Sequence, residues 1–279
     1  MEDERIIHHY TGISKLALIL KNRKIRFNRL DKVDDVSEMD AYDRIIDLSK
    51  YLFVSCWTTT SEESIPMWQM YSKEMTGIRI TVKNELFNFQ PLNPDPKYNY
   101  TRRGDVYSPI PFDQIFGDNY MIFPMFLDKR VFEKKICYVE NLKEELGQIV
   151  NLSPDDTGLN ISTDKLAGYK NKEWEFQHEF RFILFIIPSP PIPDGGFGPE
   201  LFSQLPSHVL QCFRNKIPPD ISCFDLEVHH DALNNIEVTM GPLSNDGDRI
   251  LVEALLEKYT QSGTVGDSKM KGKIRTPLR

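Results

Sequence analysis

The residues best suited to chemistry stand at the start of one apolar stretch, residues 172–187, with the sequence KEWEFQHEFRFILFII. Glu179 and Arg181 are two positions apart, so they share a face if the stretch is a strand. A carboxylate and a guanidinium are costly to remove from water unless each has a partner. The pair therefore indicates either a structural ion pair that fixes the strand end or a catalytic Glu179 that Arg181 orients. Trp174 and Gln177 lie beside the pair in either case.

The stretch is apolar on both faces beyond these charges, which predicts a central strand covered on both sides. Successive side chains of a strand alternate between its faces. One face would carry Phe180, Phe182, Leu184 and Ile186, and the other Glu179, Arg181, Ile183, Phe185 and Ile187.

A second group of ionisable residues lies in residues 29–43, where Asp34, Asp35, Glu38 and Asp40 follow one another closely. One interpretation, which we favour, is a solvated loop whose acidic residues cap the N-terminus of a helix. The other is a divalent-metal site. Hard-cation sites usually draw ligands from several segments, and the spacing of a cation-binding loop does not occur here. We therefore expect no metal at this loop.

The chain opens with a strand, a helix and a strand. Residues 5–11 predict the first strand and residues 13–21 an amphipathic helix, after which the chain is extended again. Junctions between a strand and a helix present backbone N–H groups and side chains to ligands. This junction carries His9, Tyr10 and Thr11.

Aromatic residues mark the segment that follows. Residues 52–58 predict a buried strand by their apolar and β-branched content, and residues 78–82 predict another by alternation. Between them, residues 66–71 have helical spacing that brings Trp68 and Tyr71 to one face. We expect both rings to pack in the core, Tyr71 with its polar tip outward; stacking on a ligand is the alternative.

The later part of the chain predicts more helix. Residues 126–138 and 141–150 make the largest helical block, and residues 249–259 read as an amphipathic helix. The apolar stripe of that last helix would comprise Ile250, Leu251, Ala254, Leu255 and Tyr259.

The cluster His229-His230-Asp231 invites a metal-binding interpretation. Adjacent residues of an extended segment point to opposite faces, which makes the two histidines poor joint ligands. We interpret the cluster as ordinary surface.

The composition excludes several classes of protein. The 279 residues are 40% hydrophobic and 27% charged, which is ordinary for a globular protein with a real core. A net charge of -7 argues against a global electrostatic grip on nucleic acid. The four cysteines contain no CxxC motif, which disfavours a zinc site or disulfide framework and favours a reducing compartment. No apolar run approaches the roughly 18–20 residues of a membrane span, and the acidic N-terminus lacks a secretory core. We expect a cytoplasmic protein without a membrane partner.

The domain organisation predicted from the pattern is simple. Residues 1–260 should form a single α+β domain, with an inserted loop or lid near residues 89–111. Residues 261–279 are polar and basic, which predicts a flexible or edge-lying tail.

Five stretches resemble, in this order, a bacterial family called domain of unknown function 2971: HHYTGISKLALILKNRKIRF, DDVSE, VSCWTTTSEESIPMWQMYSKEMTGIRITV, KNKEWEFQHEFRFILF and IEVTMGPLSNDGDRILVEALLEKY. Together they cover nearly the whole chain. The chain departs from the family where Asp34-Asp35-Val36-Ser37-Glu38 stands for Asn-Asp-Pro-x-Glu and where Gln177-x-Glu179 replaces a carboxylate pair. The family name carries no established activity. Its members look like accessory proteins of anti-phage or mobile-element loci, which implies a role in bacterial defence.

The opening HYTGISKLALILKNRKIRF is also similar to that of ADP-ribosyltransferases, in which a His-x-Thr strand precedes a short helix and a further strand. That resemblance implies that His9 and Thr11 hold NAD and that Glu179 completes the site, preceded by Gln177 in the Gln-x-Glu form. Tyr71 or Trp68 would supply the aromatic ring that stacks on nicotinamide. Tyr10 and Arg181 would lie in the same site.

The chemistry implied is loss of nicotinamide from NAD, which leaves an oxocarbenium-like sugar. A fixed carboxylate stabilises that developing charge in a water-poor cleft. NAD is then a substrate, and no metal is needed. The acceptor would be a protein or a nucleic acid, and a regulatory partner protein would control the activity.

The sequence as a whole predicts an α+β fold, with a mixed, mostly antiparallel split sheet and packed helices, like that of ADP-ribosyltransferases. The leading functional hypothesis is an NAD-dependent ADP-ribosyltransferase or NAD-consuming effector in anti-phage defence. One rival is a metal-dependent nuclease that uses Asp35, Glu38 and Glu179. The other is a non-catalytic sensor of a nucleotide or a phage protein. His9 across a cleft from Glu179 would favour NAD chemistry. Convergence of Asp35, Glu38 and Glu179 would favour a metal site. A simple pair of Glu179 and Arg181 would favour the sensor or a structural role.

Overall fold

The computed structural model describes residues 5–43, 46–93, 105–147, 149–152, 159–191 and 198–275. Ten strands of this part form one sheet: β1 (Ile7–Thr11), β2 (Lys24–Arg29), β3 (Leu52–Thr58), β4 (Ile78–Val82), β7 (Tyr120–Ile122), β8 (Glu133–Lys135), β13 (Glu179–Pro188), β14 (Cys223–Glu227), β15 (Glu237–Met240) and β16 (Thr264–Asp267). The main path runs β14-β2-β3-β1-β4-β15-β16, and β13 pairs with β3, β7 and β8. Every pair is antiparallel except β15 with β16, so the predicted α+β class with a mixed, mostly antiparallel sheet is confirmed.

Three short pairs of strands lie outside this sheet: β5 (Gln90–Pro91) with β6 (Tyr107–Ser108), β9 (Cys137–Val139) with β12 (Tyr169–Asn171), and β10 (Val150–Leu152) with β11 (Leu159–Ile161). The described helices are α1 (Ile13–Asn22), α2 (Val36–Tyr42), α3 (Ile65–Tyr71), α4 (Phe112–Ile115), α5 (Lys129–Phe132), α6 (Leu142–Leu146), α7 (Pro199–Arg214) and α8 (Asp246–Tyr259). Short 3-10 helices are η1 (Leu30–Lys32), η2 (Leu48–Lys50), η4 (Pro124–Leu127) and η5 (Lys172–Gln177).

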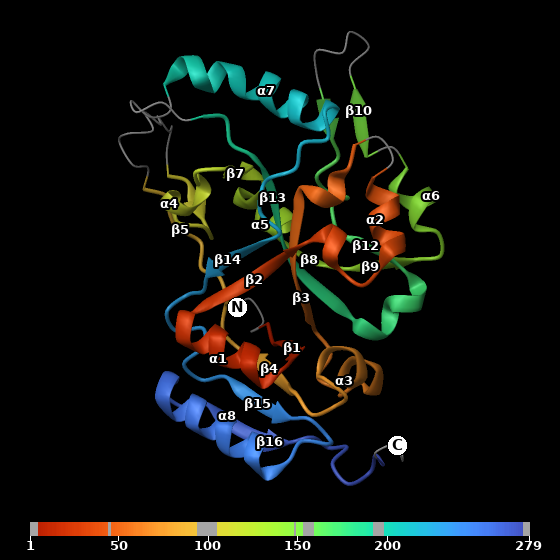
Figure 1. The fold of residues 1–279 in the computed structure, drawn as a ribbon, viewed down its shortest axis with the longest axis vertical. Helices are drawn as coiled ribbons and strands as arrows, with labels where there is room; N and C mark the ends of the chain where they lie inside the picture. The colour runs from red at the N-terminus through yellow and green to blue at the C-terminus, as the bar shows by residue number, and fades with distance from the viewer. Residues whose placement is uncertain are drawn as a thin grey trace.

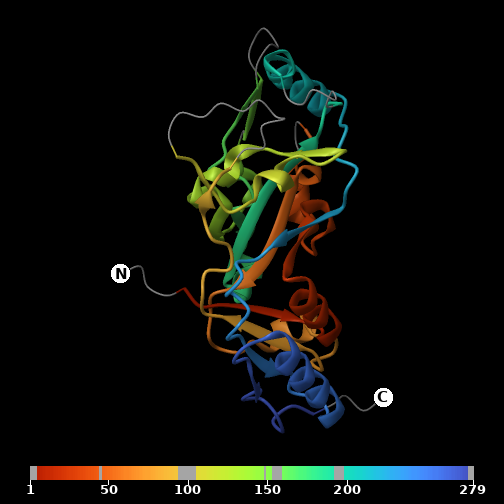
Figure 2. The ribbon, with the colours of Figure 1, turned by 90° about the vertical axis from the view of Figure 1, so that its left-hand side faces the viewer.

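Strand β3 is the branch point of the sheet. One of its edges pairs with β13 from Glu179 opposite Thr58 to Phe185 opposite Leu52. The other edge is shared, because β2 meets it at Val54 and β1 meets it only at Thr58. The sheet therefore divides between β1 and β2. Figures 1 and 2 show β3 and β13 side by side through the middle of an elongated molecule, with α7 at one end and α8 with β16 at the other.

The two faces of β13 contact different hydrophobic clusters, as its alternation predicts. The larger cluster includes Phe180, Phe182, Leu184 and Ile186, together with residues of α1, β4 and α8. The second cluster includes Ile183, Phe185 and Ile187, together with residues of α2, α6 and α7. Glu179 and Arg181 lie on the face of the second cluster, where α2 covers the sheet.

The predicted helical block at 126–138 and 141–150 is wrong. The structure has η4, the four-residue α5, the strands β8 and β9, and the five-residue α6 there. Strand β8 pairs with β13, with Phe180 opposite Lys135 and Phe182 opposite Glu133. A pairing partner about 45 positions away in the sequence overrides the local helical preference, which is a weak signal in any case.

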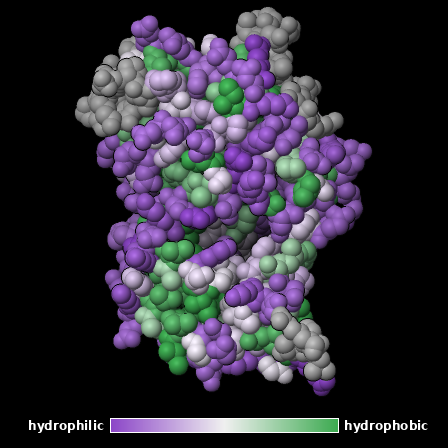
Figure 3. All heavy atoms as spheres, in the orientation of Figure 1, coloured by the Kyte–Doolittle hydropathy of each residue, from purple (hydrophilic) through white to green (hydrophobic). Residues whose placement is uncertain are grey.

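The predicted apolar stripe of α8 is also wrong in part. Ile250 and Leu251 are 64% and 58% exposed, whereas Val252 and Leu256 are buried in the larger cluster. Apolar residues occur on several sides of this helix, so periodicity alone does not select the buried side. Figure 3 shows apolar side chains gathered on the surface over α1 and α8.

The expected insertion and tail are described only in part. Residues 94–104 of the predicted lid at 89–111 lie outside the described residues, and its ends pair as β5 and β6. In the predicted tail at 261–279, Thr264–Asp267 forms β16 at the edge of the sheet. Next to it, the backbone N–H of Lys269 donates to Glu63 at 2.8 Å. Residues 276–279 lie outside the described residues.

Candidate functional site

The register of β13 against β3 fixes where the two charged side chains lie. Glu179 stands opposite Thr58 and Arg181 opposite Cys56, so both side chains project from the same face of the sheet. Helix α2 covers that face. Glu179 is 3% exposed and Arg181 is fully buried. Two charges without solvent need partners inside the protein.

Two carboxylates hold the guanidinium of Arg181. Its Nε donates to Glu179 Oε1 at 2.6 Å, and its Nη2 donates to Glu38 Oε2 at 2.9 Å. Nη1 donates to the other Glu38 oxygen and, at 3.3 Å, to the carbonyl of Ala167. Glu38 comes from α2 and is fully buried. Two edges of the Arg181 guanidinium thus make charge-assisted hydrogen bonds, one to Glu179 of β13 and one to Glu38 of α2, and these bonds link the helix to the central strand.

Lys170 supplies a second cation to the same cluster. Its ammonium lies 3.0 Å from Glu179 Oε2 and donates to Gln177 Oε1 at 2.8 Å. The ammonium is also 4.8 Å from the centre of the Trp174 ring. Lys170 is 2% exposed. These two acidic and two basic side chains can neutralise one another's charges without solvent. They are here called the buried charge network: Glu38, Lys170, Glu179 and Arg181.

A chain of hydrogen bonds leads from this network to the surface. Gln177 Nε2 donates to the hydroxyl of Tyr71 at 2.6 Å, and that hydroxyl donates to the exposed Asp34. Tyr71 is half-buried, and burial together with Asp34 raises the pKa of its hydroxyl. Gln177, Tyr71, Glu179 and Arg181, all predicted to share a site, are thus brought together.

The two carboxylates of the network differ in pKa. Burial alone would raise the pKa of Glu179, but the charges of Arg181 and Lys170 outweigh burial and lower the pKa to about 2. Burial raises the pKa of Glu38, and the charge of Arg181 opposes that shift. Glu179 is thus ionised at neutral pH, and two cations already compensate its charge. A carboxylate that is already neutralised in this way would stabilise a positive charge developing outside the network only weakly.

The acidic loop caps a helix as expected, but it is not solvated throughout, because Asp35 is 2% exposed and Glu38 is fully buried. Asp35 is the N-cap of α2, and its Oδ1 accepts from the backbone N–H groups of Ser37 at 3.0 Å and Glu38 at 3.2 Å. Glu38 instead turns inward to Arg181. Glu38 and Glu179 do converge, but on a guanidinium, and a cation already lies where a metal would bind.

His9 and Thr11 are not brought to Glu179. Strand β1 meets β3 with His8 opposite Thr58, so His8 shares the face of Glu179 and His9 projects from the other face. Accordingly, the His9 ring lies 5.0 Å from that of Trp57, and its Nδ1 is 2.9 Å from the carbonyl of Cys56. The sheet itself separates His9 from the buried charge network.

Tyr10 and Trp68 are packed rather than open to a ligand. Trp68 is fully buried, and its indole N–H donates to Glu63 at 3.0 Å. Tyr10 meets the Trp68 ring edge-on at 4.8 Å, and its hydroxyl accepts from the backbone N–H of Ser64 at 3.3 Å. The core-packing interpretation of Trp68 describes these contacts.

The junction between β1 and α1 has a different character. Gly12 is the N-cap of α1 and provides no side-chain cap, and the first turn of the helix holds no acidic residue. A Cβ at Gly12 would meet only Ser14 Oγ, at an ordinary contact distance of 3.9 Å. Thr11 is 2% exposed, and its hydroxyl has no hydrogen-bond partner within the described chain. Burial lowers the pKa of His9 to about 4; the Cys56 carbonyl opposes this shift and the charge of Lys15 adds to it.

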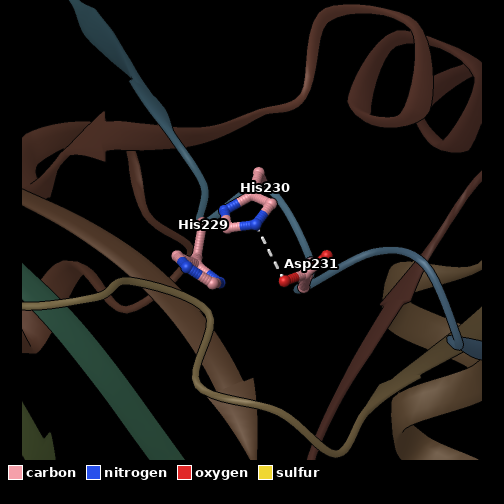
Figure 4. A group of neighbouring side chains, drawn as sticks. All are labelled: His229, His230 and Asp231. Atoms are coloured by element: carbon pink, nitrogen blue, oxygen red, sulfur yellow. Dashed lines mark ion pairs between the residues drawn. The ribbon is translucent and has the colours of Figure 1, made fainter.

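Sequence reasoning missed two features. Lys170 gave no signal, because only the tertiary structure brings its strand β12 against η5 and β13. The His229-His230-Asp231 cluster was dismissed because the histidines were expected to point apart. They follow the end of β14 and enter a turn, so their ring centres lie 4.2 Å apart (Figure 4).

Comparison of the chain with protein-family models, with curated proteins and with solved structures finds no match. The two resemblances drawn from the sequence therefore stay predictions. No helix of the described residues is both long and apolar enough to span a bilayer.

Proposed function

We propose that this chain is a nucleotide-binding sensor, and that the phosphates of its ligand bind where α1 begins. The observation that carries the proposal is the uncapped start of α1. Its first N–H groups have no side-chain acceptor from the N-cap residue, a Cβ at Gly12 would contact only Ser14 Oγ, and no acidic side chain stands in the first turn. A helix N-terminus of this kind attracts anions, and phosphate is the common one.

Three neighbouring side chains support an anionic ligand at this junction. Lys15 is exposed in the first turn and adds a positive charge. The buried hydroxyl of Thr11 has no hydrogen-bond partner among the described residues, and a ligand oxygen would satisfy it if the junction opened around the ligand. His9, which precedes Thr11 on the same face of β1, offers an imidazole beside the Trp57 ring. NAD is the nucleotide that the resemblance of the opening segment implies.

The state of Glu179 favours a sensor over a transferase. The carboxylate is buried, and Arg181 and Lys170 compensate its charge. It also lies on the opposite face of the sheet from His9. A transferase needs that carboxylate beside the ribose whose bond breaks. We therefore expect NAD to be bound and not consumed.

Isothermal titration calorimetry with NAD, ADP-ribose and AMP tests the proposal, together with an assay for released nicotinamide. Lys15→Glu should weaken binding at least tenfold, because it reverses the charge at the phosphate site. Lys21→Glu, an exposed change in the last turn of the same helix, should leave affinity unchanged. Absence of binding to all three nucleotides, or equal losses in both variants, would contradict the site. Steady release of nicotinamide would instead restore the ADP-ribosyltransferase hypothesis.

A further inference from the structure

The side chains of His229, His230 and Asp231 surround a common space at the end of β14 (Figure 4). One donor atom from each, a ring nitrogen from both histidines and a carboxylate oxygen from Asp231, lie within 4.8 Å of one another. His230 Nε2 and Asp231 Oδ2 are 2.9 Å apart. Two imidazoles and a carboxylate are a ligand set that suits zinc and neighbouring transition metals.

The surrounding contacts hold this loop in place. The backbone N–H of His229 donates to the carbonyl of Leu86 at 2.9 Å, and its carbonyl accepts from Ala232 at 3.0 Å. Arg23 donates to the carbonyl of His230. The amide of Asn234 donates to Asp231 Oδ1 at 2.9 Å, which leaves Oδ2 directed to His230. A hydrogen bond that orients a ligating carboxylate is a usual support of metal sites.

The cluster also borders a pocket of about 540 Å³. His229 and His230 line it together with Asn88, Gln90, Ser108 and Asp113. A metal held by three protein ligands keeps at least one coordination position for water or substrate, as catalytic zinc sites do. Here that position has room for an oxygen-donor ligand seated among polar side chains.

We propose that His229, His230 and Asp231 bind a divalent transition-metal ion of the zinc type, whose open position faces this pocket. Donors around tetrahedral zinc lie about 3.3 Å apart, so no pair of these donors, all within 4.8 Å of one another, needs to close by more than roughly 1.5 Å. A movement of this size is within the range of side-chain rotation. The site adjoins Arg23, the C-cap of α1, whereas the proposed nucleotide site is at the start of this helix, about 15 Å away. The two proposals are therefore independent.

Titration of the metal-free full-length chain with ZnCl₂ in a calorimeter tests the site, and Co²⁺ absorbance reports the coordination geometry. We expect one ion per chain and a rise in melting temperature with zinc concentration. His229→Ala, His230→Ala and Asp231→Asn should each weaken binding at least tenfold. Asn234→Ala should weaken it about tenfold while all three ligands remain. His178→Asn is the control, because it removes an exposed histidine elsewhere and asparagine tolerates the left-handed backbone there.

The outcomes separate clearly. Asp231→Asn keeps the size of the side chain and an oxygen that can accept from Asn234, and His230 is exposed. These variants should therefore fold. Thermal melting of the metal-free proteins checks that they do. Loss of zinc affinity in the three ligand variants with retention in the control supports the site. Wild-type protein that binds no zinc, or ligand variants that bind as tightly as wild type, would overturn it.

Discussion

At the scale of single residues, the deciding feature is that no charge of the buried network stands alone. Glu179 contacts both Arg181 and Lys170, and Arg181 also holds Glu38. Breaking a buried ion pair by removing one partner is far more costly than the pair is worth, because the other charge stays buried and uncompensated. The network therefore has structural consequences that a surface ion pair would not have.

Glu179→Gln should lower the free energy of unfolding by about 3–5 kcal/mol, because the amide leaves Lys170 and part of Arg181 uncompensated. Nucleotide affinity per folded molecule should not change. Chemical denaturation and calorimetry on the same variant measure both. Glu175→Gln, an exposed change in η5, is the matched control. A variant that unfolds like wild type but loses nucleotide binding would show that Glu179 belongs to the ligand site.

A double-mutant cycle sharpens this test. Lys170→Met combined with Glu179→Gln removes one charge of each sign and restores the balance. The double variant should be more stable than the sum of the single losses implies, with a coupling of about 1–3 kcal/mol. Strict additivity of the two losses would mean that the 3.0 Å contact between these side chains contributes no energy.

Trp68→Ala should lower the free energy of unfolding by about 3–5 kcal/mol, since the indole is fully buried and bonded to Glu63. Ile65→Ala, at a residue 52% exposed in the same helix, should cost much less. Thermal and denaturant unfolding measure the difference. If Trp68→Ala melted like wild type and only nucleotide binding were lost, the ring would be a ligand contact.

At the scale of elements, helix α2 is fixed at both ends of its first turn. The buried Asp35 caps its N-terminus, and the buried Glu38 anchors it to Arg181 of β13. The two acidic residues, only three positions apart, thus have different roles: one caps the helix and the other pairs with Arg181. Strand β1 shows the same division, because its adjacent residues His8 and His9 lie on opposite faces of the sheet.

Asp35→Ala should cost about 1 kcal/mol of stability, the usual value of a lost N-cap. Asp40→Ala, an exposed change in the same helix, is the control and should be nearly neutral. Adding magnesium should not change the melting temperature of the wild-type protein or of either variant. A stabilisation by magnesium that disappears in Asp35→Ala would instead support the nuclease hypothesis.

At the scale of the whole molecule, the buried His8 and the half-buried His9 make the fold sensitive to acid. Burial lowers the pKa of His8 and that of His9 to about 4 from an ordinary value of 6.5. The unfolded chain binds protons at these residues before the folded chain does. Their contribution is therefore complete above about pH 6.5 and is lost as the pH falls toward 4.

Unfolding measured from pH 7 to pH 4 should show this loss, up to about 3 kcal/mol for the fully buried His8 and less for the half-buried His9. Between about pH 4.5 and 2 a further loss should follow from Glu179, whose pKa is lowered to about 2. His8→Gln should flatten the upper part of the profile without touching the lower part. A profile with the same slope in wild type and His8→Gln would contradict the role of this histidine.

The sequence by itself determined the elements whose pattern is local. The strands at 52–58 and 78–82, the helix after His9-Tyr10-Thr11 and the two faces of β13 follow from alternation and helical spacing. The same local logic predicted that Glu179 and Arg181 share a face and that the acidic loop caps a helix. Each of these statements depends on residues within a few positions of one another, for which side-chain periodicity is a direct physical constraint.

Only the tertiary structure decided which charges meet and which do not. Glu38 reaches Arg181 across 143 positions of the chain, and Lys170 reaches Glu179 across nine. No local pattern encodes these meetings. The register of β1 against β3 set His9 on the far face from Glu179, and a one-residue shift would have reversed this. The turn after β14 likewise brought His229 and His230 together where an extended chain would have parted them. Long-range pairing and turn geometry depend on the packed whole, so sequence spacing alone could not supply them.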